Sequence, residues 1–241
     1  MGPAFAWFRP ETEKPILTLW QKTAPGRRLG EATRRHPQAQ HHAGRAAVHS
    51  APFPGADRLV VRPCVHGGLW GRLTRDLYPS PARVLREIRA SEHLEKIKIP
   101  TPRIEAVILY PAGPFYRFEV VTRQIPESQD LVHALAGRPS PAVRTRLFSA
   151  VRKLLSQLHR HGIRHPDLNA RNILLAPSRS GWTAYLLDVD AVLFETPSAP
   201  AVDTANRHRL LRSLLKRARL GDLGWSEAEV AQLWRELFPR R

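Results

Sequence analysis

Three polar side chains in the second half of the chain have the types and spacing that metal-assisted phosphoryl transfer requires. Asp167 and Asn172 lie in the stretch HPDLNARNILL, and Asp188 lies in AYLLDVD, each beside an apolar run. One carboxylate can accept the proton of an attacking hydroxyl, while an amide and a second carboxylate hold Mg²⁺ against nucleotide phosphates with hard oxygen ligands. The set therefore offers one general base and one magnesium site.

The surrounding sequence predicts how these side chains come together. A helix over 140–162 ends at Gly162, a polar loop follows, and an apolar strand over 172–176 is expected to pair with 184–190 across the turn 177–182. Antiparallel pairing brings Asp188 to the same edge as Asn172 and Asp167. A second interpretation stays open, in which the loop side chains only cap backbone groups. Asp190 either assists a metal site or ends the strand.

The rest of the chain divides into a strand-rich first half and a helical second half. A strand over 57–65, a helix over 80–97 opened by Ser80 and Pro81, and two strands over 104–110 and 115–122 precede a change of character near 122–130. Helices are expected over 130–137, 140–162, 205–221 and 226–238, the last with Ser226 and Glu229 as a capping box. The pattern predicts an α+β fold of two lobes.

Composition and charge restrict the partners of the chain. Lys and Arg number 38 against 21 Asp and Glu, so the net charge is +17 and the pI is near 11.3, which favours an anionic partner such as nucleic acid or a membrane leaflet. The single cysteine, Cys64, excludes an internal disulfide and fits a reducing cytosol. No apolar run approaches the roughly 18 residues of a membrane span, and no secretory signal opens the sequence. We expect a cytoplasmic protein.

Residues 1–43 are rich in Arg, His, Pro and Gln without an apolar period, which predicts a poorly ordered basic arm. His36, His41 and His42 in this segment are either a metal-binding tract or, as in many His-rich linkers, solvated side chains. The expected domains are thus the arm over 1–43, a nucleotide-binding lobe over 44–125, and a lobe over 126–241 that carries catalysis and acceptor binding.

Several motifs resemble a known family. HPDLNARNILL resembles the catalytic loop H-x-D-L-x-x-x-N of protein-kinase-like phosphotransferases, and LLDVD stands where those enzymes carry Asp-Phe-Gly. The Asp-Leu-Asn wording, the block RPCVHGGLWGRLTRDLY and the helix ANRHRLLRSLLK together resemble the bacterial 3-deoxy-D-manno-octulosonic acid (Kdo) kinases of the lipopolysaccharide kinase family, over residues 44–220. The resemblance implies a protein-kinase-like fold.

The resemblance assigns roles to the three polar residues. It implies that Asp167 is the catalytic base and that Asn172 and Asp188 are the Mg²⁺ ligands. Glu87 would be the helix acid that anchors the phosphate-binding basic residue, although a solvated helix acid is the competing interpretation.

The nucleotide-binding residues depart from the family pattern. Arg62 stands at the position of the phosphate-binding lysine and would donate to phosphate oxygens as a planar fork, or else is a strand-edge charge. Gly44 and Gly55 replace a full glycine-rich loop. The HGGLWG block either binds phosphate through backbone amides, faces the substrate, or is a turn that packs Trp70.

By this resemblance the chain uses ATP and Mg²⁺ to phosphorylate a hydroxyl of the Kdo sugar on lipid A, and it works at the inner face of the bacterial inner membrane. Pro166 replaces the arginine of H-R-D and no A-P-E follows Asp188, which favours a small-molecule or lipid acceptor. The anionic lipid surface agrees with the charge. The alternatives are another small-molecule or protein hydroxyl as acceptor, and a nucleic-acid-binding module without catalysis.

Overall fold

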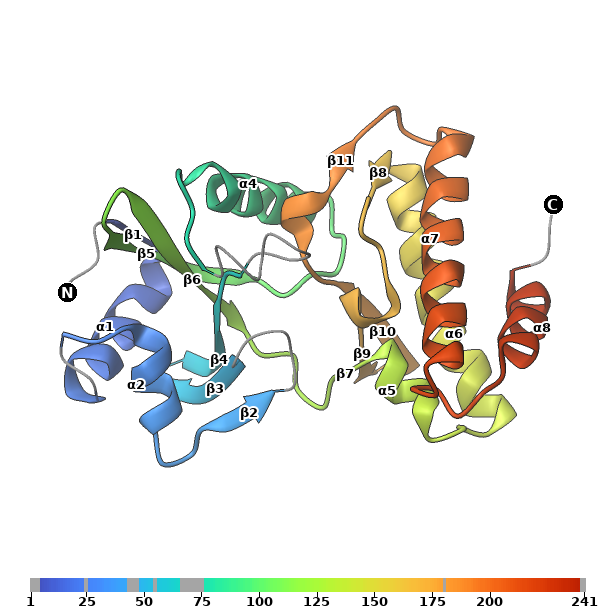
Figure 1. Ribbon diagram of the computed structural model, residues 1–241, viewed down its shortest axis with the longest axis horizontal. Helices are drawn as coiled ribbons and strands as arrows, with labels where there is room; N and C mark the ends of the chain where they lie inside the picture. The colour runs from blue at the N-terminus through green and yellow to red at the C-terminus, as the bar shows by residue number, and fades with distance from the viewer. Residues whose placement is uncertain are drawn as a thin grey trace. The chain divides into compact units, whose positions relative to one another are not determined.

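A computed structural model describes residues 5–23, 26–42, 48–53, 56–65, 76–179 and 181–238 of the chain (Figure 1). The chain divides into two units, one of residues 1–88 and 102–124 and the other of residues 89–101 and 125–241. The boundary between residues 124 and 125 lies within the segment 122–130, where the sequence changes character. Residues 89–101 belong to the second unit, although they precede residues 102–124 of the first unit in the sequence. A division of the sequence at one boundary does not predict this.

The first unit is built on an antiparallel sheet of six strands in the order β1-β5-β6-β4-β3-β2. The expected strands at 57–65, 104–110 and 115–122 are confirmed as β4, β5 and β6. The elements of this unit are β1 (Phe5–Phe8), α1 (Pro10–Thr23), α2 (Leu29–Arg35), β2 (Gln40–His42), β3 (Val48–Phe53), β4 (Ala56–Pro63), β5 (Ile104–Ala112), β6 (Phe115–Arg123) and the first part of α4 (Ala82–Lys96).

Both faces of this sheet are covered (Figure 1). Along β5, Ala106, Ile108 and Tyr110 pack against α1 and α2, whereas Val107 and Leu109 face the cluster that includes α4. Successive side chains of a strand point to opposite faces, so two layers of helix explain why β5 is buried along most of its length.

The helices α1 and α2 correct the prediction of a poorly ordered arm over residues 1–43. Ile16, Leu19 and Trp20 are spaced as one helical stripe and are buried against the sheet, as is Leu29 of α2. Pro10 at the first helical position and acidic residues in the first turn also mark a helix start. The polar composition of the segment hid this short stripe, because only one face of α1 is apolar.

Among the residues that the structure describes, the second unit contains the end of α4, the four α-helices α5 to α8, two short helices and two small sheets. Its elements are the end of α4, β7 (Gln129–Asp130), α5 (Leu131–Ala136), α6 (Pro141–Arg160), β8 (Ile163–Arg164), the short helix η1 (Ala170–Asn172), β9 (Ile173–Ser178), β10 (Gly181–Leu186), the short helix η2 (Val189–Ala191), β11 (Leu193–Phe194), α7 (Pro200–Arg219) and α8 (Glu227–Leu237). The sheets have the orders β10-β9-β7 and β11-β8.

One apolar core holds the second unit together, with residues from α5, α6, α7, α8 and the hairpin β9–β10. The predicted helices are confirmed, and the capping box of Ser226 and Glu229 opens α8. The predicted hairpin is also confirmed, but its second strand covers residues 181–186 rather than 184–190. One difference concerns α7, which begins at Pro200 rather than at residue 205 because Pro200 provides the first helical position. The fold is the expected α+β arrangement of a strand-rich unit followed by a helical unit.

Candidate active site

The loop between β8 and β9 carries Asp167 and is held from within. The ring Nδ1 of His165 accepts a hydrogen bond from the backbone N–H of Asp167 at 3.2 Å, so the proton of the neutral ring lies on Nε2. That Nε2 lies 3.1 Å from the carbonyl oxygen of Leu187, to which it donates. His165 is fully buried. The same ring therefore fixes both the backbone of Asp167 and the residue that precedes Asp188.

Asn172 completes the connection between the loop and the hairpin. Its Nδ2 donates to the carbonyl oxygen of Asp167 at 3.1 Å, and its own carbonyl oxygen accepts from the N–H of Leu187 at 2.9 Å. The second bond extends the ladder in which Ile173 pairs with Leu186. The structure thus brings Asp167, Asn172 and Asp188 to one end of the hairpin, as the sequence predicts.

The two carboxylates of this group differ from Asn172 in exposure. Asp167 and Asp188 are exposed, and Asn172 is buried. Within the described part of the chain, neither carboxylate receives a side-chain hydrogen bond or an ion pair. Asp188 has φ 53° and ψ 48°, a left-handed conformation that Asp and Asn tolerate better than most residues. Both acids are therefore available to a ligand.

Asn206 of α7 is a positioning residue that the sequence analysis missed. Its Oδ1 accepts from the N–H of His165 at 3.0 Å, and its Nδ2 donates to the carbonyl oxygen of Ile163 at 2.8 Å. Asn206 lies on the buried stripe of α7 together with Val202 and Leu210, and it is 1% exposed. A polar residue at helical spacing within an apolar stripe is the signal that could have identified it.

Asp190 lies in η2, four residues beyond the end of β10 at Leu186, so it does not end the strand. The described residues contain no group of three His, Cys, Asp or Glu side chains that could hold a metal ion. A metal site at this end of the hairpin would therefore need the amide oxygen of Asn172 beside the carboxylate of Asp188.

In the first unit, Arg62 and Glu87 form the expected ion pair. Arg62 lies on β4, an interior strand of the sheet, and Glu87 lies on α4 with only 2% of its surface exposed. The alternatives of a strand-edge arginine and a solvated helix acid are therefore wrong. A buried carboxylate beside a guanidinium restricts the side chain of Arg62, because separating the pair would leave a charge buried.

The remaining nucleotide-binding predictions fall outside the described residues. Gly44, Gly55 and residues 66–75, which include the HGGLWG block, belong to the parts of the chain about which the structure gives no description.

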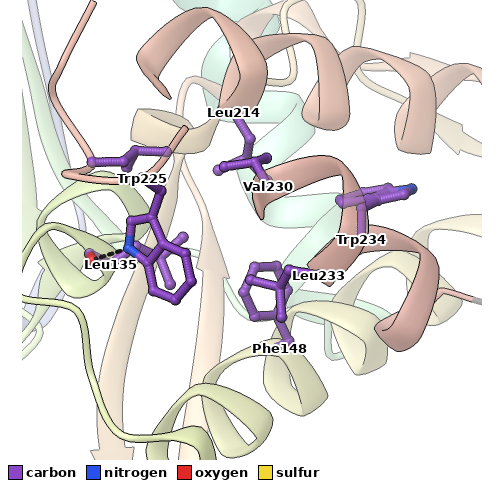
Figure 2. A pocket seen from close by; sticks show the side chains of 8 residues that line it. Leu135, Phe148, Leu214, Trp225, Val230, Leu233 and Trp234 are labelled. Carbon is purple, nitrogen blue, oxygen red and sulfur yellow. Dashed lines mark hydrogen bonds between the residues drawn. The ribbon is translucent and has the colours of Figure 1, made fainter. Parts of the chain in front are cut away.

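A pocket among α5, α6, α7 and α8 is apolar in character (Figure 2). Its lining consists of Leu, Val, Phe and Trp side chains, and the indole of Trp225 donates to the carbonyl oxygen of Leu135 at 3.0 Å. None of the candidate site residues lines it. The lining has no charged side chain to hold a phosphate, and the Trp225 indole already donates to Leu135, so this pocket belongs to the packing of the second unit.

Comparison with known proteins gives the family of the chain. The model of the lipopolysaccharide kinase (Kdo/WaaP) family matches residues 39–236. The chain belongs to this family. The match includes the loop and hairpin that carry Asp167, Asn172 and Asp188, as well as Arg62 and Glu87.

Several relatives in the Kdo/WaaP family are named 3-deoxy-D-manno-octulosonic acid kinase. The protein of Xanthomonas oryzae pv. oryzae (strain PXO99A) is 36% identical over 172 residues, which cover 69% of this chain and 64% of that protein. The protein of Stenotrophomonas maltophilia (strain R551-3) is 34% identical, with 72% and 67% covered. The Haemophilus influenzae protein is 30% identical, with 72% and 73% covered. The chain thus spans slightly less than two thirds of the Xanthomonas relative.

A solved structure described as WaaP in complex with acyl carrier protein has the same fold. It aligns with a TM-score of 0.53 over 98% of this chain and 90% of its own, at 18% identity. Among the residues that the structure describes, no helix has the length and hydropathy needed to cross a membrane.

Proposed function

We propose that the chain transfers the γ-phosphoryl group of ATP to a hydroxyl of the Kdo sugar on lipid A. The observation that carries the proposal is the set of contacts by which His165 and Asn172 hold Asp167 and Asp188 at one end of the β9–β10 hairpin. The names of the Xanthomonas, Stenotrophomonas and Haemophilus relatives support Kdo as the acceptor.

Asp167 is the proposed base. Its carboxylate is exposed while its backbone is fixed at two points, by the His165 ring and by the Asn172 amide. In the proposed step the acceptor oxygen attacks the γ-phosphorus, its proton passes to Asp167, and the bond to the bridging oxygen of ADP breaks. A fixed backbone keeps the carboxylate within reach of the acceptor, which is the main contribution of the protein to such a reaction.

Asn172 and Asp188 are the proposed Mg²⁺ ligands, and their oxygens fit this ion. The hydrogen bond from Nδ2 to Asp167 fixes the orientation of the Asn172 amide and leaves Oδ1 as the oxygen available for coordination. Asp188 adds an exposed carboxylate. Carboxylate and amide oxygens are the hard ligands that Mg²⁺ prefers. When bound, the ion would neutralise charge on the nucleotide phosphates.

Arg62 is the proposed phosphate-binding residue of the first unit. The ion pair with the buried Glu87 fixes the position of its guanidinium, a planar group with five N–H donors. Arginine in this position can bind phosphate oxygens as a fork, which fits the replacement of the family lysine. The proposed nucleotide is ATP.

The proposed working place is the inner face of the bacterial inner membrane, where the chain would bind peripherally. The net charge of +17 supports an anionic surface as partner, since each Lys or Arg near anionic lipid contributes about 1 kcal/mol of attraction.

The acceptor is tested by incubating the protein with labelled ATP and Mg²⁺ and either Kdo-lipid A in detergent micelles or a soluble aminoglycoside. We expect label in Kdo-lipid A alone, and its loss when the metal is removed by EDTA. Label in the aminoglycoside alone would assign a different acceptor, and label in neither by a folded, ATP-binding protein would overturn the proposal.

A further inference from the structure

Two neighbouring apolar side chains on β11 lie exposed at the surface of the second unit. Leu193 is 42% and Phe194 49% exposed. Neighbouring residues of a strand point to opposite faces, so neither face of β11 is fully covered here by the described residues. Single exposed apolar residues are common and need no explanation. Among the exposed large apolar residues of the described chain, however, these two alone are adjacent in sequence.

The position of this pair relative to the candidate base makes it relevant to the acceptor. Leu193 is paired with Arg164, which precedes Asp167 by three residues. With at most 5.5 Å across an antiparallel pair and 3.8 Å per residue along the chain, the Cα atoms of Leu193 and Asp167 are at most about 17 Å apart.

β11 is held in place by several contacts. Glu195 forms an ion pair with Arg164, and its N–H donates to the carbonyl oxygen of Gly162 at 2.7 Å. The ring of Phe194 lies 4.8 Å from the ring of His93, edge to face. Phe194 is therefore exposed and anchored at once, which favours a binding contact over a chance exposure.

Two exposed cations lie near the pair, in company with the acids Glu92 and Glu95 of α4 and with Glu195, which pairs with Arg164. Lys96 follows His93 by one helical turn on α4. Arg160 is the last residue of α6, next to His159, whose carbonyl oxygen accepts from the N–H of Ser198 at 2.9 Å. Both cations are exposed, and neither has an ion pair within the described residues. α6 contains no acidic residue in its whole length. Exposed apolar side chains beside basic ones are the combination that binds the interface of an anionic bilayer.

We propose that Leu193 and Phe194 insert into the surface of an anionic lipid bilayer and thereby bring the second unit to a lipid-borne acceptor. This inference rests on the proposed function for its purpose, but the membrane contact itself can be measured without catalysis. The pair would bind lipid, and Asp167 would act on a sugar at the same surface.

The experiment compares the wild type with the double variant Leu193→Ser, Phe194→Ser and with Leu220→Ser as matched control. Leu220 is 58% exposed on the same unit, and it lies beyond the end of α7. Sedimentation with vesicles of phosphatidylglycerol and phosphatidylcholine should be on the order of tenfold weaker for the double variant, from the lost burial of two apolar side chains. The control should sediment like the wild type.

Two outcomes would overturn the proposal. Equal sedimentation of the double variant and the wild type would show that Leu193 and Phe194 do not contact the membrane. A loss of sedimentation in Leu220→Ser as large as that of the double variant would show that any exposed apolar residue has this effect. Circular dichroism of the double variant verifies that it is folded.

A kinetic comparison connects the contact to the acceptor. The double variant should lose kcat/KM on Kdo-lipid A in vesicles and keep it on a deacylated, water-soluble Kdo acceptor. An equal loss on both acceptors would overturn the proposal. A wild type that phosphorylates neither acceptor but sediments as expected would refute the proposed function and leave the membrane contact supported.

Discussion

At the scale of residues, the candidate site depends on hydrogen bonds that fix backbone rather than on contacts between the acidic side chains. His165 and Asn172 bind backbone groups of residues 167 and 187, and the two carboxylates stay exposed. The positions of the two acids are therefore set by their backbone and do not depend on the charge of their side chains. A change of Asp to Asn in either acid should therefore remove charge with little effect on the fold.

Asp188→Asn should lower phosphate transfer by about a hundredfold or more, because a ligand charge is lost at the proposed metal site. Asn also tolerates the left-handed conformation at φ 53°, so Asp188→Asn should keep the stability of the wild type. Ala tolerates this conformation less well, and Asp188→Ala should lower the free energy of unfolding by about 1 to 2 kcal/mol. The measurements are the rate as a function of Mg²⁺ concentration and urea unfolding of both variants. An unchanged Mg²⁺ dependence in Asp188→Asn would exclude Asp188 as a ligand.

At the scale of elements, Gly162 allows the residues after β11 to pack closely against the chain that follows α6. Gly162 follows the end of α6 with φ +67°, and a Cβ there would lie 2.2 Å from the carbonyl oxygen of Glu195. The sequence predicts Gly162 as the helix terminator, which is confirmed. It does not predict the close approach of residue 195, since that contact is made by a segment more than thirty residues later in the chain.

Gly162→Ala should lower the free energy of unfolding by about 2 to 4 kcal/mol, from the left-handed backbone and the clash with Glu195. Because residues 195 and 196 must move, β11 should shift and lipid binding should fall as well. Urea unfolding and vesicle sedimentation measure the two effects. Gly137→Ala is the matched control, since a Cβ at that position meets no atom within 4 Å. Equal stability of the two variants would contradict the account of Gly162.

A buried carboxyl joins α2 to the sheet of the first unit. Oε2 of Glu119 accepts from the hydroxyl of Tyr110 at 2.8 Å and from the N–H of Gly30 at 3.1 Å. Burial raises the pKa of Glu119 above its ordinary value of 4.5, against the opposing effect of these two hydrogen bonds. The folded protein therefore holds the Glu119 proton more tightly than the unfolded chain does.

Because of this raised pKa, Glu119 makes the free energy of unfolding fall as the pH rises from 4.5 to the folded pKa. Glu119→Gln cannot titrate and should lack this fall. The free energy of unfolding of the variant minus that of the wild type should thus increase with pH across this range. Urea unfolding of both proteins at a series of pH values is the measurement, and a constant difference would contradict the raised pKa.

At the scale of the whole molecule, the excess of 17 positive charges and the exposed pair on β11 predict two separable contributions to membrane binding. The electrostatic contribution should weaken steeply with salt, since the screening length falls from about 10 Å at 0.1 M to about 3 Å at 1 M. The apolar contribution should persist. We expect wild-type sedimentation with anionic vesicles to fall to a residual level at high salt. This residual sedimentation should be absent in the double variant. Wild-type sedimentation that does not change with salt concentration would contradict the electrostatic contribution.

The chain also shows which features are accessible from one sequence. The hairpin and the helices of the second unit follow from local patterns, whereas the pairing of Arg62 with Glu87 was implied only by the family resemblance. The helices α1 and α2 were missed because their few apolar residues are diluted by polar ones, and Asn206 was missed because its partners lie 41 and 43 residues away in sequence. Contacts of that kind are made only by the folded chain.

The measurement that tests the account most directly is single-turnover transfer from labelled ATP to Kdo-lipid A by the wild type, Asp167→Asn and Asp203→Asn. Asp203 is the matched control because it is an acid of the same unit whose Oδ1 accepts from the Arg207 guanidinium at 2.8 Å, on α7. We predict that Asp167→Asn loses at least about a hundredfold in rate, as expected for a positioned base, and that Asp203→Asn keeps the wild-type rate. Full transfer by a folded Asp167→Asn protein would contradict the account.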